Sequence, residues 1–105
     1  MTQLTAEQLK EKLNSNENFV LDLYATWCGP CKVMLANLEK ASTMLTESQK
    51  TNYSFYKFDI DQDRELAMNE LGIRSVPTVK FYKNGQEYHS KTGVMSPPEL
   101  ISLLD

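Results

Sequence analysis

The stretch NFVLDLYATWCGPCK, residues 18–32, guides the interpretation of the whole chain. Its first half is an almost continuously apolar run of strand length, which is typical of a strand in a sheet covered on both faces. Both cysteines of the chain follow at once, and only Gly29 and Pro30 separate Cys28 from Cys31. We therefore predict a strand, and then a helix that begins at about Cys28 or Pro30.

This placement of the cysteines indicates thiol–disulfide exchange. Unpaired N–H groups and the positive end of the helix dipole favour a thiolate at Cys28. Cys31 lies one helical turn further on, so the two sulfurs share a face and can bond. Because Gly29 adds no side chain beside it, we expect Cys28 to be an exposed nucleophile and Cys31 a shielded resolving thiol. A C-x-x-C pair after a strand in a βαβ pattern is itself a redox signature.

Two alternatives to redox chemistry remain open for the cysteine pair. A structural zinc site needs four ligands, whereas the chain offers two cysteines and His89, so zinc would have to be shared between two copies. Alternatively both cysteines are buried and inert, which the Gly-Pro insert disfavours. A purely structural bond is disfavoured too, because the loop that it closes is too small to constrain the unfolded chain much.

Length and composition exclude several classes of protein. The 105 residues suit one domain, 1–105, and 41% apolar with 24% charged residues is an ordinary globular composition. The net charge of −3, with no run of Lys or Arg, argues against nucleic-acid binding. No apolar stretch approaches the ~20 residues that a spanning helix needs, and the first residues lack the apolar block of a secretory signal. We therefore expect a cytoplasmic protein, where a close cysteine pair is catalytic or metal-binding rather than a structural staple.

Helices and strands alternate along the predicted chain. Thr5 and Gln8 form a capping-box pattern, and Asn84-Gly85 is a strong hairpin-turn signal. Ser96, followed by Pro-Pro-Glu, is the pattern of a capped helix start. Helices are predicted over residues 5–14, 28–49, 63–72 and 96–104, strands over 18–25 and 53–60, and a hairpin over 78–91. Any earlier strand must fit into residues 1–4. This order predicts an α/β fold with a mixed sheet between helices.

Over its whole length the sequence resembles the thioredoxin family. The segments WCGPCK (27–32) and RSVPTVKFYKNG (74–85), and the region of Gly93, match the motifs of that family. The resemblance implies the thioredoxin fold, a central mixed β-sheet flanked by helices on both faces, and reduction of disulfides in other proteins. It also implies that a thioredoxin reductase, which uses NADPH, reduces the oxidised chain again. The chain itself would then bind no cofactor and would work through its redox-active Cys28–Cys31 disulfide. Two departures are Ala36, where a helix-kinking proline is common, and Tyr24, where Phe or Trp is common.

Asp22 is the one carboxylate in an apolar strand. It is either solvated on an edge strand or buried beneath the cysteines, where desolvation raises its pKa and lets it take the proton of Cys31. The resemblance implies the buried, catalytic position, because thioredoxins carry a buried Asp six residues before the first cysteine. Lys57 matches the lysine that the family places near this Asp; its alternative is a solvent-facing strand residue.

The resemblance also implies a substrate site beside the cysteines. Most bonds before proline are trans, which is the default expectation for Pro77. The resemblance to the thioredoxin family instead implies a cis Val76–Pro77 bond that faces the cysteines. The backbone of Val76 could then pair with an extended substrate. The alternative role for Trp27 is that of core filler. The implied shallow apolar groove is completed by Trp27, Gly29, Pro30, Gly93 and Val94.

An acidic pattern further along resembles a calcium loop. The segment DIDQDRELAMNE fills positions 1, 3, 5 and 12 of that template with Asp59, Asp61, Asp63 and Glu70. Arg64 stands where the sharp turn needs Gly, and the preceding residues predict a strand. We therefore interpret these acids as a strand end and helix caps.

Taken together, these patterns predict a cytoplasmic, monomeric protein-disulfide reductase. A His between the cysteines would favour an oxidant, and its absence favours a reductant. The expected partners are thioredoxin reductase and disulfide-containing proteins, with no nucleic acid and no membrane. The alternative from another class is a non-catalytic thioredoxin-fold binding subunit or chaperone, which would keep its function when both cysteines are replaced by Ser.

Overall fold

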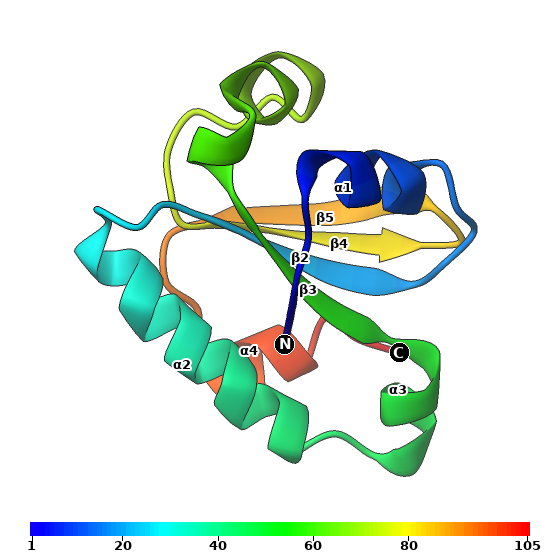
Figure 1. Cartoon of the computed structure of the whole chain (residues 1–105). Helices are drawn as coiled ribbons and strands as arrows, with labels where there is room; N and C mark the ends of the chain where they lie inside the picture. The colour runs from blue at the N-terminus through cyan, green and yellow to red at the C-terminus, as the bar shows by residue number, and fades with distance from the viewer.

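The computed structural model describes residues 1–105 and has a five-stranded sheet at its centre, with helices on both faces (Figure 1). The strands are β1 (Thr2–Gln3), β2 (Phe19–Tyr24), β3 (Ser54–Asp59), β4 (Thr78–Lys83) and β5 (Gln86–Thr92). The helices are α1 (Ala6–Leu13), α2 (Gly29–Thr43), α3 (Glu47–Asn52) and α4 (Pro97–Ile101), with short helical turns η1 (Ile60–Gln62) and η2 (Leu66–Glu70). The predicted α/β class with a mixed sheet is confirmed, and a two-residue strand precedes the first helix.

The sheet order β1-β3-β2-β4-β5 puts the apolar strand β2 at the centre. β1 and β2 run parallel to β3, whereas β4 is antiparallel to β2 and to β5. Because β2 and β3 are parallel, both strands end at the same edge of the sheet. The cysteines that follow β2 and the η1 turn that follows β3 are therefore brought together there.

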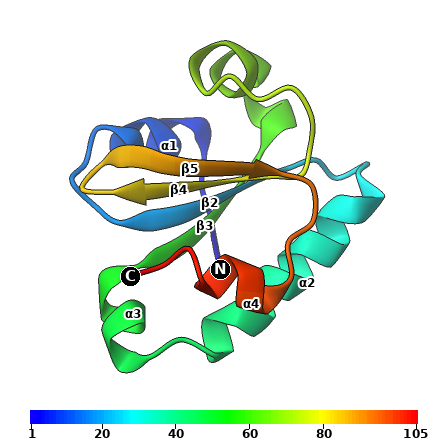
Figure 2. The ribbon, with the colours of Figure 1, turned by 180° about the vertical axis from the view of Figure 1, so that it is seen from behind.

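Two apolar clusters cover the two faces of the sheet. Figures 1 and 2 show α1 and η2 on one face and α2 and α4 on the other. Successive residues of a strand point to opposite faces. Leu21 and Leu23 accordingly belong to the cluster that includes Leu9 of α1, whereas Val20 packs with residues of α2 and α4. Asp22, two residues after Val20, therefore faces the layer formed by α2.

The predicted capping and turn signals are confirmed. Thr5 and Gln8 exchange side-chain and backbone hydrogen bonds at the start of α1. The Ser96 hydroxyl accepts a bond from the N–H of Glu99 at the start of α4. Asn84 and Gly85 have φ values of +53° and +80°, as a tight hairpin turn requires.

The single helix predicted over residues 28–49 is confirmed up to residue 43 and is wrong beyond it. α2 runs without interruption through Ala36 but ends at Thr43, and the separate helix α3 begins after Thr46. The hydroxyl of Thr43 bonds back to the carbonyl of Lys40 in the last turn of α2. Thr46 and Gln49 then form a second capping box, which starts a new helix instead of continuing the first.

The helix predicted over residues 63–72 is shorter and wider than expected. η2 spans Leu66–Glu70 and is a π-helical turn, in which the N–H of Leu71 donates to the carbonyl of Leu66. Asp63 caps it as predicted, because its carboxylate accepts a bond from the N–H of Leu66. Gly72 ends it with a φ of +69°.

Candidate active site

Cys28 and Cys31 are joined by a disulfide in the first turn of α2. Cys28 is the residue that caps the helix, and its Sγ accepts a hydrogen bond from the N–H of Cys31 at 3.2 Å. The Cα atoms lie 5.3 Å apart, within the usual range for a disulfide. When the bond is reduced, this N–H and the helix dipole stabilise a negative charge on the sulfur of Cys28.

Cys28 is less accessible than the sequence suggested. In the disulfide form it is 6% exposed, against 3% for Cys31, so the expectation of an exposed nucleophile is wrong for this state. The physical reason is that both cysteines belong to the apolar cluster against which Val76 packs. The surface around the two cysteines is formed by neighbouring residues such as Trp27, which is 64% exposed. Trp27 is therefore no core filler.

The loop before β4 lies against the segment after β5. The Val76–Pro77 bond is cis, as the resemblance implied. The carbonyl of Pro77 accepts a hydrogen bond at 2.9 Å from the N–H of Gly93, whose φ of +96° suits glycine. Val94, the residue after Gly93, is exposed. Val76 lies outside every strand and makes no backbone hydrogen bond to the rest of the chain.

Asp22 is a buried carboxyl group on the central strand. It is 1% exposed and neither of its oxygens has a hydrogen-bond partner, which excludes the solvated edge position. Burial raises the pKa of Asp22, and the positive charge of Lys57 opposes part of this rise. The resulting pKa is about 7. Lys57 lies directly beside Asp22 in the register of β2 and β3 and is half-buried. The two form no ion pair, and the Lys57 Nζ lies 5.8 Å from the ring centre of Tyr24.

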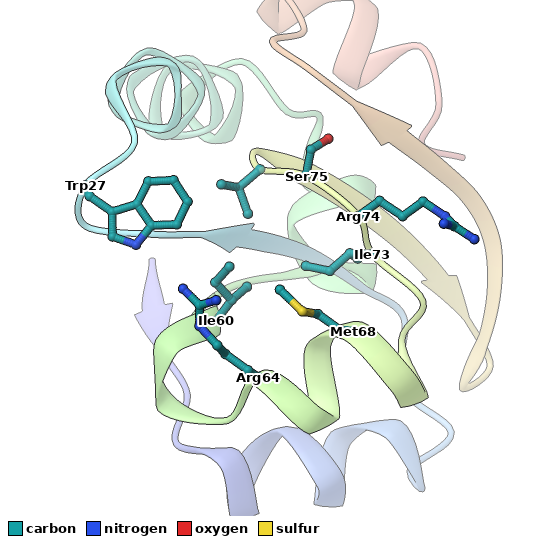
Figure 3. A pocket seen from close by; sticks show the side chains of 8 residues that line it. Trp27, Ile60, Arg64, Met68, Ile73, Arg74 and Ser75 are labelled. Carbon is teal, nitrogen blue, oxygen red and sulfur yellow. The ribbon is translucent and has the colours of Figure 1, made fainter.

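A pocket of about 140 Å³ lies between Trp27, which precedes Cys28 in the chain, and the loop before Pro77 (Figure 3). The side chains around it are Trp27, Ile60, Arg64, Met68, Ile73, Arg74, Ser75 and Val76. Apart from Trp27 and Val76, sequence reasoning did not assign these residues to the site. Arg74 and Ser75 fall in the matched segment 74–85, but nothing in that segment indicates a pocket. η1, η2 and this loop are distant from residues 27–31 along the chain, so only the fold shows that they meet there.

A hydrogen bond to η1 holds Trp27 in place. Its indole Nε1–H donates a hydrogen bond of 2.8 Å to a carboxylate oxygen of Asp61. The guanidinium of Arg64 donates to the other oxygen of Asp61, also at 2.8 Å. The carboxylate thus joins an indole and a guanidinium, which orients an otherwise exposed ring at the edge of the site.

The acids of the calcium-loop pattern serve as caps and as hydrogen-bond partners. Asp59 accepts a bond from the N–H of Asp61 at the start of η1, and Asp63 caps η2. The capping interpretation is confirmed for these two. The structure contains no group of three or more His, Cys, Asp or Glu side chains placed to hold a metal ion. It also has no helix of the length and apolarity needed to cross a membrane.

Comparison with known proteins identifies the family. The family model for thioredoxin matches residues 1–105. The chain belongs to the thioredoxin family. The thioredoxin of Mycoplasmoides gallisepticum is 36% identical over 97 residues, which cover 92% of this chain and 91% of that one.

Solved thioredoxin structures have the same fold as this chain. The crystal structure of Malassezia sympodialis thioredoxin matches with a TM-score of 0.77 and 34% identity, over 97% of this chain and 86% of that one. Plasmodium falciparum thioredoxin matches with a TM-score of 0.80 and 30% identity, over 97% of both chains. As a member of the thioredoxin family with its cysteine pair at bonding distance, the chain is a thiol–disulfide oxidoreductase of the protein-disulfide reductase type.

Proposed function

We propose that the reduced chain passes two electrons to disulfides of other cytoplasmic proteins and is then reduced again by a thioredoxin reductase that uses NADPH. The observation that carries this proposal is the disulfide at the first turn of α2, where the sulfur of Cys28 accepts the N–H of Cys31. The chain itself acts as a monomer and binds no cofactor in this scheme. Its own dithiol is the electron carrier.

The first step is attack by Cys28. Its thiolate, stabilised by the N–H of Cys31 and the start of α2, forms a bond to one sulfur of the substrate disulfide. The substrate bond breaks and its other sulfur leaves as a thiolate. This gives a mixed disulfide between Cys28 and the substrate.

The second step is release by Cys31. Cys31 loses its proton, attacks the sulfur of Cys28 and displaces the remaining substrate thiolate, which leaves the Cys28–Cys31 disulfide. Asp22 is the proposed proton acceptor, because a carboxyl group with a pKa of about 7 is partly ionised near neutral pH. Lys57 assists by opposing the effect of burial on that pKa.

The substrate is proposed to bind as an extended segment beside Pro77. The free backbone N–H and carbonyl of Val76 support this, since they can pair with a strand laid along them. Trp27 and the exposed Gly29 and Pro30 form one side of the contact. Gly93 and Val94 form the other side.

Insulin-disulfide reduction tests the proposal. We expect the wild-type chain to reduce insulin when supplied with a thioredoxin reductase and NADPH, and also with dithiothreitol in place of that pair. Cys28→Ser should abolish reduction, whereas Cys31→Ser should accumulate a mixed disulfide that mass spectrometry detects through Cys28. A double Ser variant that still supports the cellular role would instead identify a binding subunit. An adduct carried by Cys31 in the Cys28→Ser variant, in a yield equal to that of the Cys28 adduct, would contradict the assigned order of attack.

A further inference from the structure

Both arginines of this acidic protein lie at the pocket beside Trp27. The chain has a net charge of −3 and contains only two arginines, Arg64 and Arg74. Both line the pocket next to Trp27 (Figure 3). Arg64 stands just before η2 and Arg74 belongs to the loop before Pro77, so the fold brings two different segments to one site.

The two guanidinium groups differ in what they already bind. Arg64 is paired with Asp61 at 2.8 Å, so its charge is largely compensated. Arg74 is exposed and takes part in none of the ion pairs or side-chain hydrogen bonds of the structure. Figure 3 shows Arg74 at the end of the pocket away from Trp27, with its guanidinium turned outward. Arg74 is therefore the arginine whose donors and charge are all uncompensated within the chain.

Arg74 also lies next to the backbone that the substrate is proposed to use. It is two residues before Val76, whose N–H and carbonyl are free. The lining between Arg74 and Trp27 is mainly apolar and includes Ile73 and Met68. A segment laid across this surface would place one side chain over the apolar lining and a neighbouring one within reach of Arg74.

We propose that Arg74 is a specificity-determining residue that favours substrate segments with an acidic side chain near the disulfide. The inference rests on the proposed function and adds a substrate class to it. A carboxylate is the group that a guanidinium with free donors binds best, because two parallel N–H···O bonds match its geometry. The partner is thus a disulfide-containing protein whose exposed loop combines an apolar residue with Asp or Glu.

The expected preference is moderate and sensitive to salt. Because Arg74 is exposed, its contact with a carboxylate is of the surface type. For such pairs we expect roughly a two- to fivefold higher second-order rate constant for an acidic than for a neutral substrate. Raising the ionic strength should reduce this ratio, since salt screens charges at the surface.

A set of matched peptides tests the inference. Each peptide is closed by one disulfide and carries Glu, Gln or Lys at a single position, taken in turn on either side of the attacked cysteine. Reduced protein is mixed with excess peptide in a stopped-flow instrument, and oxidation is followed through the fluorescence of Trp27, the only tryptophan, which adjoins Cys28. The wild-type chain should react fastest with a Glu peptide and slowest with the corresponding Lys peptide. Arg74→Gln should bring the rates together, and Arg74→Glu should reverse their order.

The rates with the Glu, Gln and Lys peptides are compared as ratios within each variant, so that a general loss of activity does not affect the result. Lys40→Gln is the matched control, because it deletes the same charge from an exposed residue near the end of α2 and leaves no ion-pair partner behind. It should keep the wild-type ratio. Equal rates for Glu, Gln and Lys peptides in the wild-type chain would overturn the inference, as would an equal effect of Lys40→Gln and Arg74→Gln. Failure to reduce any peptide, and insulin too, would instead refute the proposed function.

Discussion

At the scale of single residues, Asp22 stands out because it is a buried acid without a partner. Its oxygens make no hydrogen bond, and burial raises its pKa to about 7 from an ordinary 3.8. A carboxyl group with a raised pKa in the folded state holds its proton more tightly there than in the unfolded chain. Its contribution to stability is therefore fully present below about pH 4 and is lost as the pH rises towards 7.

Asp22→Asn should accordingly stabilise the oxidised protein in a pH-dependent way. The gain in the free energy of unfolding should be smallest near pH 4 and reach a plateau above pH 7, with an increase on the order of 4 kcal/mol between the two. Urea unfolding of both proteins at a series of pH values measures it. A gain that is the same at pH 4 and pH 8 would contradict the burial of an ionisable group at this position.

At the scale of elements, the β4–β5 hairpin is held against the loop that precedes β2. The N–H of Gly85 donates to the carbonyl of Glu17, and the N–H of Asn84 donates to the side chain of Asn18. A Cβ atom at residue 85 would collide with the carbonyl oxygen of Ser15. The turn thus needs glycine for its positive φ and also for the close approach of another backbone.

Gly85→Ala should destabilise the protein more than Gly72→Ala does. Both glycines have positive φ, but a Cβ at Gly72 meets no atom within 4 Å. Gly72→Ala should therefore lower the free energy of unfolding by about 1 kcal/mol, and Gly85→Ala by more than about 2 kcal/mol, because the clash adds to the backbone strain. Chemical denaturation of the two variants compares them directly. Equal losses would show that the hairpin shifts away from Ser15 without a penalty.

At the scale of the whole molecule, α2 serves both the site and the core. Its first turn carries the cysteines, while Met34, Leu38 and Ala41 are buried against the sheet and α4. The N–H of Met95, just before α4, points to the sulfur of Met34 at 3.2 Å. The position of the cysteines therefore depends on packing further along the same helix.

Leu38→Ala should weaken this packing, whereas Val33→Ala should not. Leu38 is fully buried and Val33 on the same helix is 52% exposed. Truncating Leu38 should lower the free energy of unfolding by about 3 kcal/mol, because it removes buried methyl groups and leaves a cavity. Val33→Ala should change it by less than about 0.5 kcal/mol. Thermal and urea unfolding provide the measurement, and similar effects of the two changes would refute the buried position of Leu38.

Local signals were sufficient for much of the fold. The Thr5 and Gln8 capping box, the Asn84-Gly85 turn and the apolar run of β2 act between residues close in the chain, so the sequence alone identified them. The Thr46 and Gln49 box was equally visible and would have divided the predicted helix over residues 28–49. The π-helical turn at Leu66–Glu70 had no such signal, because the pattern of a wide turn resembles that of an ordinary helix.

The cysteine pair, its place at a helix start and the single acid in β2 follow from the sequence by itself, since they depend on spacing and residue type. Only the tertiary structure decided which distant residues stand beside them. The contact of Trp27 with Asp61 spans 34 residues, and the pocket joins η1, η2 and the loop before Pro77 to the start of α2. These neighbours meet because parallel β2 and β3 end at one edge of the sheet, a geometry that hydrogen bonds between strands impose and that no local pattern encodes.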